Sequence, residues 1–297
     1  MGVINFTPTK NTWHLQDLLL YLLTEPYNQK ELYLYQNIFF DIRKMKMHLW
    51  DDLKGHLEIP FRKYAYVKDR NGQHVSLYGD RLKKVTQYDK DDPTLHESDI
   101  PPMTRFLVDQ YGDSDEASTG HRTMFFDIEV EVTEGFPDVQ KAQNPITSIA
   151  LYDCTTETYF TYCFDPHKRI EDYTKGDEVV EFYETEYEML NKFFQKYLEI
   201  RPTILSGWNS EFFDIPYLYN RAVRVLGPEL ANLMSPISKV IYSDYKKKHT
   251  IAGVSSLDYL QLYRQFTFTQ QSSYRLDYIG EVEVGMKKVS YEGTLND

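Results

Sequence analysis

Apolar positions along residues 121–297 alternate between the spacing of strands and the spacing of helices. Apolar and polar side chains that alternate predict strands, and apolar side chains three or four residues apart predict a helix. The predicted strands are Thr123 to Val132, Ile146 to Tyr152, Thr158 to Phe164 and the buried Thr203 to Ser206. A helix is expected from Glu184 to Ile200. Its apolar positions are Tyr187, Leu190, Phe194 and Tyr197.

The pattern after the fourth strand continues with helices and one hairpin. A helix is expected from Ile215 to Leu226, ending at Gly227-Pro228. Lys239 to Val254 has the pattern of a hairpin with a basic tip, and further helical segments follow to about Gly280. Three strands, then a helix and a fourth strand, predict an α/β domain with an RNase H-like mixed sheet.

Residues 31–111 have a different pattern, rich in Tyr and Phe and typical of strands. The strands expected here are Leu32 to Asp41, Met45 to Trp50 and Leu57 to Lys68. Asn71-Gly72 is a strong hairpin signal, so Val75 to Tyr78 is expected to be the returning strand. A helix should follow Pro101-Pro102, from Met103 to Tyr111. This part is predicted to be a small β-rich α+β domain.

These patterns divide the chain into four parts. Residues 1–30 are an N-terminal extension, with a short helix expected from Thr12 to Leu23 that ends at Pro26. Residues 31–111 form the β-rich domain. Residues 112–120 are small, polar and acidic and are interpreted as a linker. Residues 121–297 form the α/β domain.

Composition narrows the functional classes. The formal net charge of -12 argues against a general nucleic-acid clamp, but a metal-dependent nuclease needs an acidic site and stays compatible with it. Two cysteines argue against a disulfide framework and fit a reducing cytosol. The apolar run from Leu18 to Leu23 is too short to cross a membrane, so a cytoplasmic location is expected.

Three carboxylates in apolar surroundings are the candidate chemistry. Asp127 and Glu129 lie two residues apart in a predicted strand, so both should project from one face while Ile128 faces the opposite layer. Asp214 follows a Gly-Trp-Asn turn much later in the chain, at the start of a predicted helix. Several carboxylates on one patch suit Mg²⁺ or Mn²⁺. Asp-x-Glu alone is a weak signal, and a strand with two solvated acids is its ordinary interpretation.

The sequence around these acids resembles that of a known protein family. Phe126-Asp127-Ile128-Glu129 resembles the first exonuclease motif of the family B DNA polymerases, and Asn209 to Asp214 resembles the second. The segments from Ile204 to Arg221, from Ser256 to Tyr259 and from Ser273 to Ile279 resemble the tailed-phage branch of the family. The resemblance covers roughly residues 31–297.

This resemblance implies a 3′→5′ proofreading exonuclease domain, preceded by the N-terminal domain of a viral DNA polymerase. It implies two bound ions, Mg²⁺ or Mn²⁺: Asp127 would bridge them, Glu129 would bind the nucleophile-side ion and Asp214 the leaving-group-side ion. Asn209 would support the site. Phe213 would lie near the frayed primer end, or it is an ordinary core residue.

The implied partners are single-stranded primer 3′ ends, primer–template DNA, and the C-terminal polymerase portion in cis or as a second chain. A sliding clamp would bind through that portion, and no membrane is involved. The basic tip Lys246-Lys247-Lys248 would contact DNA phosphates, or it is a solvated turn. If the protein is viral, the host cytoplasm is the expected location.

The third motif of the family, Tyr-x-x-x-Asp, does not occur after Asn209 in these 297 residues. Asp258 and Asp277 are the alternative carboxylates. The chain is therefore expected to be the N-terminal portion of a polymerase, with weak or no nuclease activity by itself. Two alternatives stay open at this point: a non-catalytic half of a split polymerase that needs a partner chain, and a stand-alone metal-dependent nuclease.

Overall fold

A mixed sheet of seven strands carries two of the three candidate acids. The structure is a computed structural model, and it describes residues 34–132, 135–167 and 169–289. The order in the sheet is β10-β11-β9-β8-β7-β12-β15. Its strands are β7 (Thr123–Val130), β8 (Ile146–Asp153), β9 (Thr158–Phe164), β10 (Tyr173–Lys175), β11 (Glu178–Tyr183), β12 (Ile204–Gly207) and β15 (Ser255–Asp258). Strand β7 runs antiparallel to β8 and parallel to β12, so the mixed α/β sheet is confirmed.

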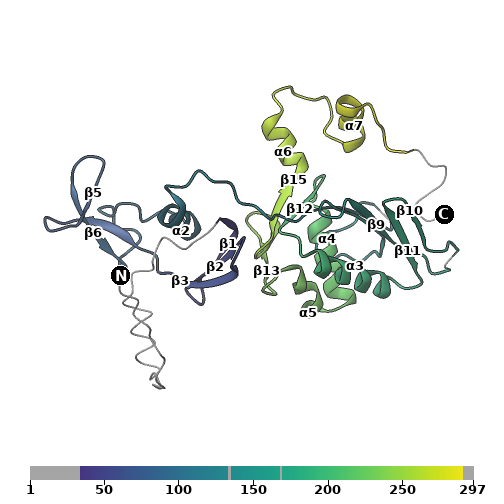
Figure 1. The fold of residues 1–297 in the computed structure, drawn as a ribbon, viewed down its shortest axis with the longest axis horizontal. Coiled ribbons are helices and arrows are strands. Elements are labelled where there is room, and N and C mark those ends of the chain that lie inside the picture. Colours follow the sequence, from purple (N-terminus) through teal and green to yellow (C-terminus); the bar gives the residue numbers. More distant parts are fainter. Residues whose placement is uncertain (1–33, 133–134, 168, 290–297) are drawn as a thin grey trace, which may run out of the picture.

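Helices lie on both sides of this sheet in Figure 1. They are α3 (Glu186–Ile200), α4 (Asp214–Val225), α5 (Pro228–Ala231), α6 (Tyr259–Phe266) and α7 (Leu276–Val284), with the 3₁₀ turn η2 (Asn232–Met234). In this view α3 and α5 lie below the strands and α6 and α7 above them. The main hydrophobic core joins β7, β8 and β12 to α3 and α4.

Helix α3 is amphipathic, as its spacing predicted, but one position was wrong. Tyr187 is 54% exposed, whereas Leu190, Phe194 and Tyr197 are buried together with Met189 and Phe193. The buried stripe is therefore displaced around the helix from the one that the sequence suggested. The buried stripe still consists of residues spaced four and seven apart on one face of the helix.

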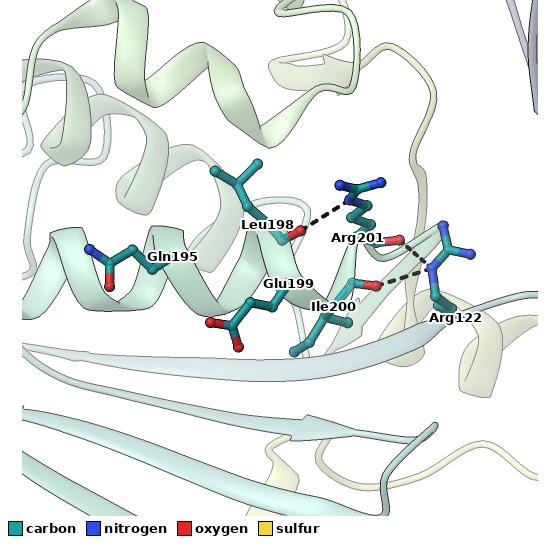
Figure 2. Close-up of a pocket in the computed structure, with 6 residues that line it drawn as sticks. All are labelled: Arg122, Gln195, Leu198, Glu199, Ile200 and Arg201. Atoms are coloured by element: carbon teal, nitrogen blue, oxygen red, sulfur yellow. Dashed lines mark hydrogen bonds between the residues drawn. The ribbon is translucent and has the colours of Figure 1, made fainter.

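The C-terminal end of α3 is closed by two arginines, which Figure 2 shows. Arg122 Nε donates to the carbonyl oxygens of Ile200 and Arg201 at 3.0 and 2.7 Å, and Arg201 Nε donates to that of Leu198 at 3.3 Å. Cations at this end of a helix satisfy the last carbonyls and complement its dipole. A hollow of about 780 Å³ lies beside these side chains.

Residues 34–111 contain two small antiparallel sheets and one helix. The sheets are β1-β2-β3 and β4-β6-β5. The elements are β1 (Tyr35–Asp41), β2 (Lys46–Asp51), β3 (Gly55–Pro60), β4 (Ala65–Lys68), β5 (His74–Val75), β6 (Arg81–Val85) and α2 (Pro102–Tyr111). The β-rich α+β character of this part is confirmed, although the strand expected from Leu57 to Lys68 is two strands.

The strand pairing expected for the hairpin at Asn71-Gly72 was wrong. The turn forms, because Asp69 accepts hydrogen bonds from the backbone N–H groups of Asn71 and Gly72. However, β4 and β5 both pair with β6, which lies between them. A Cβ on Gly72 would lie 2.3 Å from the backbone of Leu82, so only glycine lets the chain cross this close to β6.

The β1-β2-β3 sheet contacts the larger domain through Asp41 and Trp50. Lys239 Nζ lies 2.8 Å from the carboxylate of Asp41, and this hydrogen bond lowers the pKa of Asp41. The Trp50 ring lies against Gly253, whose φ of +88° suits glycine; a Cβ there would meet the ring at 2.5 Å. Close contact at Trp50 therefore depends on a glycine.

Some predictions fall outside the described residues. The helix expected from Thr12 to Leu23 is one of them. Between α2 and β7 the described chain forms neither helix nor strand, which is compatible with a linker at 112–120. The division at 31–111, 112–120 and 121–297 stays a prediction. No helix within the described ranges combines the length and apolar character needed to cross a bilayer.

Candidate active site

Asp127 and Glu129 project from the same face of β7. Phe126, Ile128 and Val130 alternate with them and are buried in the core, while Asp127 is exposed and Glu129 is half-buried. β7 lies between β8 and β12, so its backbone is held on both sides. The alternation that the sequence predicted is confirmed, and it aims both carboxylates away from the core.

Asp214 reaches the same place from the first turn of α4. It is 3% exposed, and its Oδ1 accepts a hydrogen bond of 3.1 Å from the backbone N–H of Ile128. Ile128 separates Asp127 from Glu129 in the sequence. The carboxylate of Asp214 is therefore anchored to the strand between the two other acids.

The backbone N–H of Ile128 can bond to Asp214 because the pairing of β7 with β12 ends before Ile128. The ladder between the two strands ends at the pair Ser206 and Phe125. There the chain turns away at Gly207, where a Cβ would lie 2.6 Å from the carbonyl oxygen of Phe126. A larger residue would push the turn, and Asp214 with it, away from Ile128.

The electrostatics of the three acids are unfavourable when no cation is bound. Burial, followed by the charge of Asp127, raises the pKa of Asp214 to about 7. Desolvation, followed by the charge of Glu129, also raises the pKa of Asp127. Carboxylates held together against their own repulsion are typical of functional sites. Hard oxygen donors of this kind fit Mg²⁺ or Mn²⁺.

Glu129 is held by a cation from the last described segment. Lys288 Nζ lies 3.2 Å from Glu129 Oε1, and the Lys288 backbone N–H donates to Asp277 at 2.7 Å. Within the described ranges, the ligand atoms of Asp127, Glu129 and Asp214 do not all lie within 4.8 Å of one another. Binding of one ion by all three would therefore require their ligand atoms to move closer together.

The loop that leads into Asp214 is held by Asp258, a role that sequence analysis missed. The Asp258 carboxylate accepts from the backbone N–H groups of Asn209 and Glu211 at 3.2 and 3.0 Å. It also caps α6 by accepting from those of Leu260 and Gln261 at 2.9 and 3.3 Å. Both its oxygens are thus engaged by backbone groups, which argues against Asp258 as a further metal ligand.

Asn209 and Phe213 have different surroundings. Asn209 has φ +64°, a left-handed conformation that asparagine tolerates, and it allows the turn between β12 and α4. Phe213 is half-buried and packs against the core, with ring centroids 5.2 Å from Phe136 and 5.6 Å from Tyr217. Phe136 is 82% exposed. The aromatic pair therefore has both a packing role and an accessible surface.

The predicted basic hairpin exists as β13 (Val240–Ser243) and β14 (Lys248–Ile251). Lys246 and Lys247 are exposed at its tip, where Lys247 Nζ lies 3.9 Å from Asp244. Lys248 instead contacts the two carboxylate oxygens of Glu211 at 3.1 and 2.9 Å. Lys248 thus joins the hairpin to the loop before Asp214. The two residues are far apart in the sequence, and no local sequence pattern predicted their contact.

Comparison with known proteins agrees with this geometry. The family described as "DNA polymerase family B, exonuclease domain" matches residues 103–279, which contain all three acids. The chain belongs to the family B DNA polymerases. The resemblance seen in the two acidic motifs is confirmed at the level of the family.

Individual relatives give the same result over a limited length. The chain is 36% identical over 204 residues to the DNA-directed DNA polymerase of Escherichia phage RB69, covering 59% of this chain and 22% of the relative. It is 33% identical over 198 residues to that of Enterobacteria phage T4, with 57% and 22% covered. DNA polymerase 1 of Sulfurisphaera ohwakuensis is 28% identical over 207 residues, with 67% and 20% covered. The chain thus spans about a fifth of the length of these relatives.

Proposed function

We propose that this chain supplies the 3′→5′ proofreading exonuclease of a phage-type DNA polymerase, and that Asp127, Glu129 and Asp214 hold its metal ions. The observation that carries the proposal is the hydrogen bond from the Ile128 N–H to Asp214, which brings an acid from α4 to the strand between the other two. The family match to the exonuclease domain supports the same assignment.

The three acids would hold two Mg²⁺ or Mn²⁺ ions. Such a pair supplies activation of the attacking water and stabilisation of the leaving oxygen of a phosphodiester. Asp127 would bind both ions, Glu129 the nucleophile-side ion and Asp214 the leaving-group-side ion. Asp214 can keep its bond to Ile128 through Oδ1 and use its other oxygen as a ligand.

The substrate would be the single-stranded 3′ end of a mispaired primer. The exposed ring of Phe136 beside Phe213 offers a surface on which an unpaired base can stack. Lys246 and Lys247, at the hairpin tip, would contact phosphates, and Asn209 would hold the loop. Lys248 would act indirectly through its ion pair with Glu211.

The whole polymerase would act on primer–template DNA in the host cytoplasm, with a sliding clamp bound through its C-terminal portion. We also propose that the chain alone is a weak nuclease and that a polymerase portion, in cis or as a second chain, completes the site. Two observations support this dependence: Asp258 is engaged by backbone groups, and Glu129 is paired with Lys288.

A single-turnover assay tests the proposal. The 297-residue chain in excess is incubated with Mn²⁺ and single-stranded DNA labelled at the 3′ end, and in parallel with the same strand labelled at the 5′ end. We expect slow release of the 3′ label as mononucleotide, loss of this release in Asp127→Ala, and its retention in Glu131→Gln.

The control, Glu131→Gln, removes the next acid beyond β7, which is half-buried, and keeps the size of the side chain. Release from the 5′ end, or release that persists in Asp127→Ala, would contradict the exonuclease assignment. Rapid hydrolysis by the wild-type chain that Asp127→Ala abolishes would contradict only the dependence on a further polymerase portion.

A further inference from the structure

Three potential metal ligands lie together on the β2–β3 ladder, in the part of the chain that precedes the exonuclease domain. His48 pairs directly with Glu58 across the two strands, and Trp50 pairs with His56. Side chains two residues apart on a strand share a face. His48, His56 and Glu58 therefore project from one face of a regular antiparallel ladder, a rigid scaffold for a site.

The distances between their ligand atoms suit a single ion. His48 Nδ1 lies 2.9 Å from His56 Nε2 and 4.0 Å from Glu58 Oε1, and all three atoms lie within 4.8 Å of one another. Zinc binds imidazole nitrogens at about 2.0–2.1 Å, so two nitrogens on one tetrahedral ion lie about 3.3 Å apart. Separation of the two rings by a few tenths of an ångström would admit the ion.

His48 is the buried member of the three. His48 is 3% exposed among the rings of Phe39 and Trp50, and its Nε2 has no hydrogen-bond partner in the described part of the chain. Metal binding would use Nδ1, the atom that lies close to His56 and Glu58, and not this Nε2.

The two other ligands leave an entrance for the ion. His56 and Glu58 are both exposed to solvent. Lys46 Nζ engages Glu58 Oε2 at 2.6 Å, which leaves Oε1 directed to His48. The Trp50 ring stacks on His56 at a centroid distance of 4.9 Å and fixes its orientation.

We propose that His48, His56 and Glu58 form a site for a transition-metal ion such as Zn²⁺, separate from the carboxylate cluster of the exonuclease. Two imidazoles and one carboxylate are donors that zinc, nickel and copper prefer, whereas magnesium prefers oxygen donors. The ion would join β2 to β3 next to Trp50, the residue that packs against Gly253 of the exonuclease domain.

The test measures binding of Zn²⁺ to the 297-residue chain by titration calorimetry. Excess Mg²⁺ is present throughout, so that the carboxylate cluster is occupied by an ion that oxygen donors prefer. The variants are His56→Ala and Glu58→Gln, both at exposed positions, and the matched control is His167→Ala, another exposed histidine. The visible absorption of bound Co²⁺ gives a second measurement that reports nitrogen ligands.

We expect one equivalent of Zn²⁺ to bind to the wild type and to His167→Ala with the same affinity. His56→Ala should weaken binding by at least about 100-fold, because even residues that only orient a ligand typically contribute about 10- to 100-fold. Far-ultraviolet circular dichroism of each variant establishes that it is folded. Absence of stoichiometric binding to the wild type, or equal affinity of wild type and His56→Ala, would overturn the proposal.

Discussion

Asp214→Asn should stabilise the metal-free protein while removing its response to metal. The change removes the charge of a buried carboxylate, but the amide oxygen can still accept the hydrogen bond from the Ile128 N–H. The structure assigns Asp214 a pKa of about 7, against an ordinary value of 3.8. At about 1.4 kcal/mol per pH unit, this difference corresponds to about 4 kcal/mol of destabilisation by the ionised side chain.

The sign of the pH dependence follows from the raised pKa. The folded protein binds a proton at Asp214 more tightly than the unfolded chain does, so the metal-free wild type gains stability as the pH falls from about 7 towards 4. Above pH 7 the full cost is present. The advantage of Asp214→Asn should therefore be a few kcal/mol at pH 8 and should shrink towards zero near pH 4.

Urea unfolding in the presence of a chelator measures this difference, with Glu131→Gln as the control for loss of a negative charge outside the three acids. Addition of Mg²⁺ at pH 8 should stabilise the wild type and not Asp214→Asn, because an ion that binds only the folded state stabilises that state. Equal stabilities of wild type and Asp214→Asn at pH 8, or a gain that does not change with pH, would refute the reasoning.

Three further variants test other parts of the site. Asp258→Ala removes the acceptor for four backbone N–H groups and should lower the free energy of unfolding by about 1–3 kcal/mol, measured by urea denaturation. Gly207→Ala places a Cβ 2.6 Å from the carbonyl oxygen of Phe126 and should cost about 1–3 kcal/mol and reduce Mn²⁺ affinity, whereas unchanged affinity would contradict the role of the close turn. Lys246→Ala with Lys247→Ala should weaken single-stranded DNA binding and reduce the slope of log affinity against log salt by about 1.4, as fluorescence anisotropy would show; an unchanged slope would exclude phosphate contacts at the tip.

The central elements of the site could be predicted because they depend on local patterns. Alternation along β7 predicts which residues face the core, and it correctly separated Asp127 and Glu129 from Ile128. The apolar stripe of α4 and the turn before it likewise placed Asp214 at a helix start. The acidic motifs were specific enough to identify the family.

The remaining features depend on contacts between distant residues. Strand β10 is exposed throughout and is defined by pairing with β11, so its sequence carries little apolar signal. The Asn71-Gly72 turn formed as expected, but β4 and β5 do not pair with each other. Each of them pairs with β6, which lies between them. Asp258 binds N–H groups 47 and 49 residues away, and periodicity cannot report such a bond.

Electron paramagnetic resonance of Mn²⁺ tests most directly whether the three acids act as one metal site. Titration of the metal-free chain gives the number and affinity of bound ions, independently of DNA hydrolysis. The account predicts that Asp127→Asn, Glu129→Gln and Asp214→Asn each weaken Mn²⁺ binding strongly, whereas Glu131→Gln leaves it unchanged. Wild-type affinity in Asp127→Asn or Asp214→Asn would contradict the claim that β7 and α4 build a shared metal site.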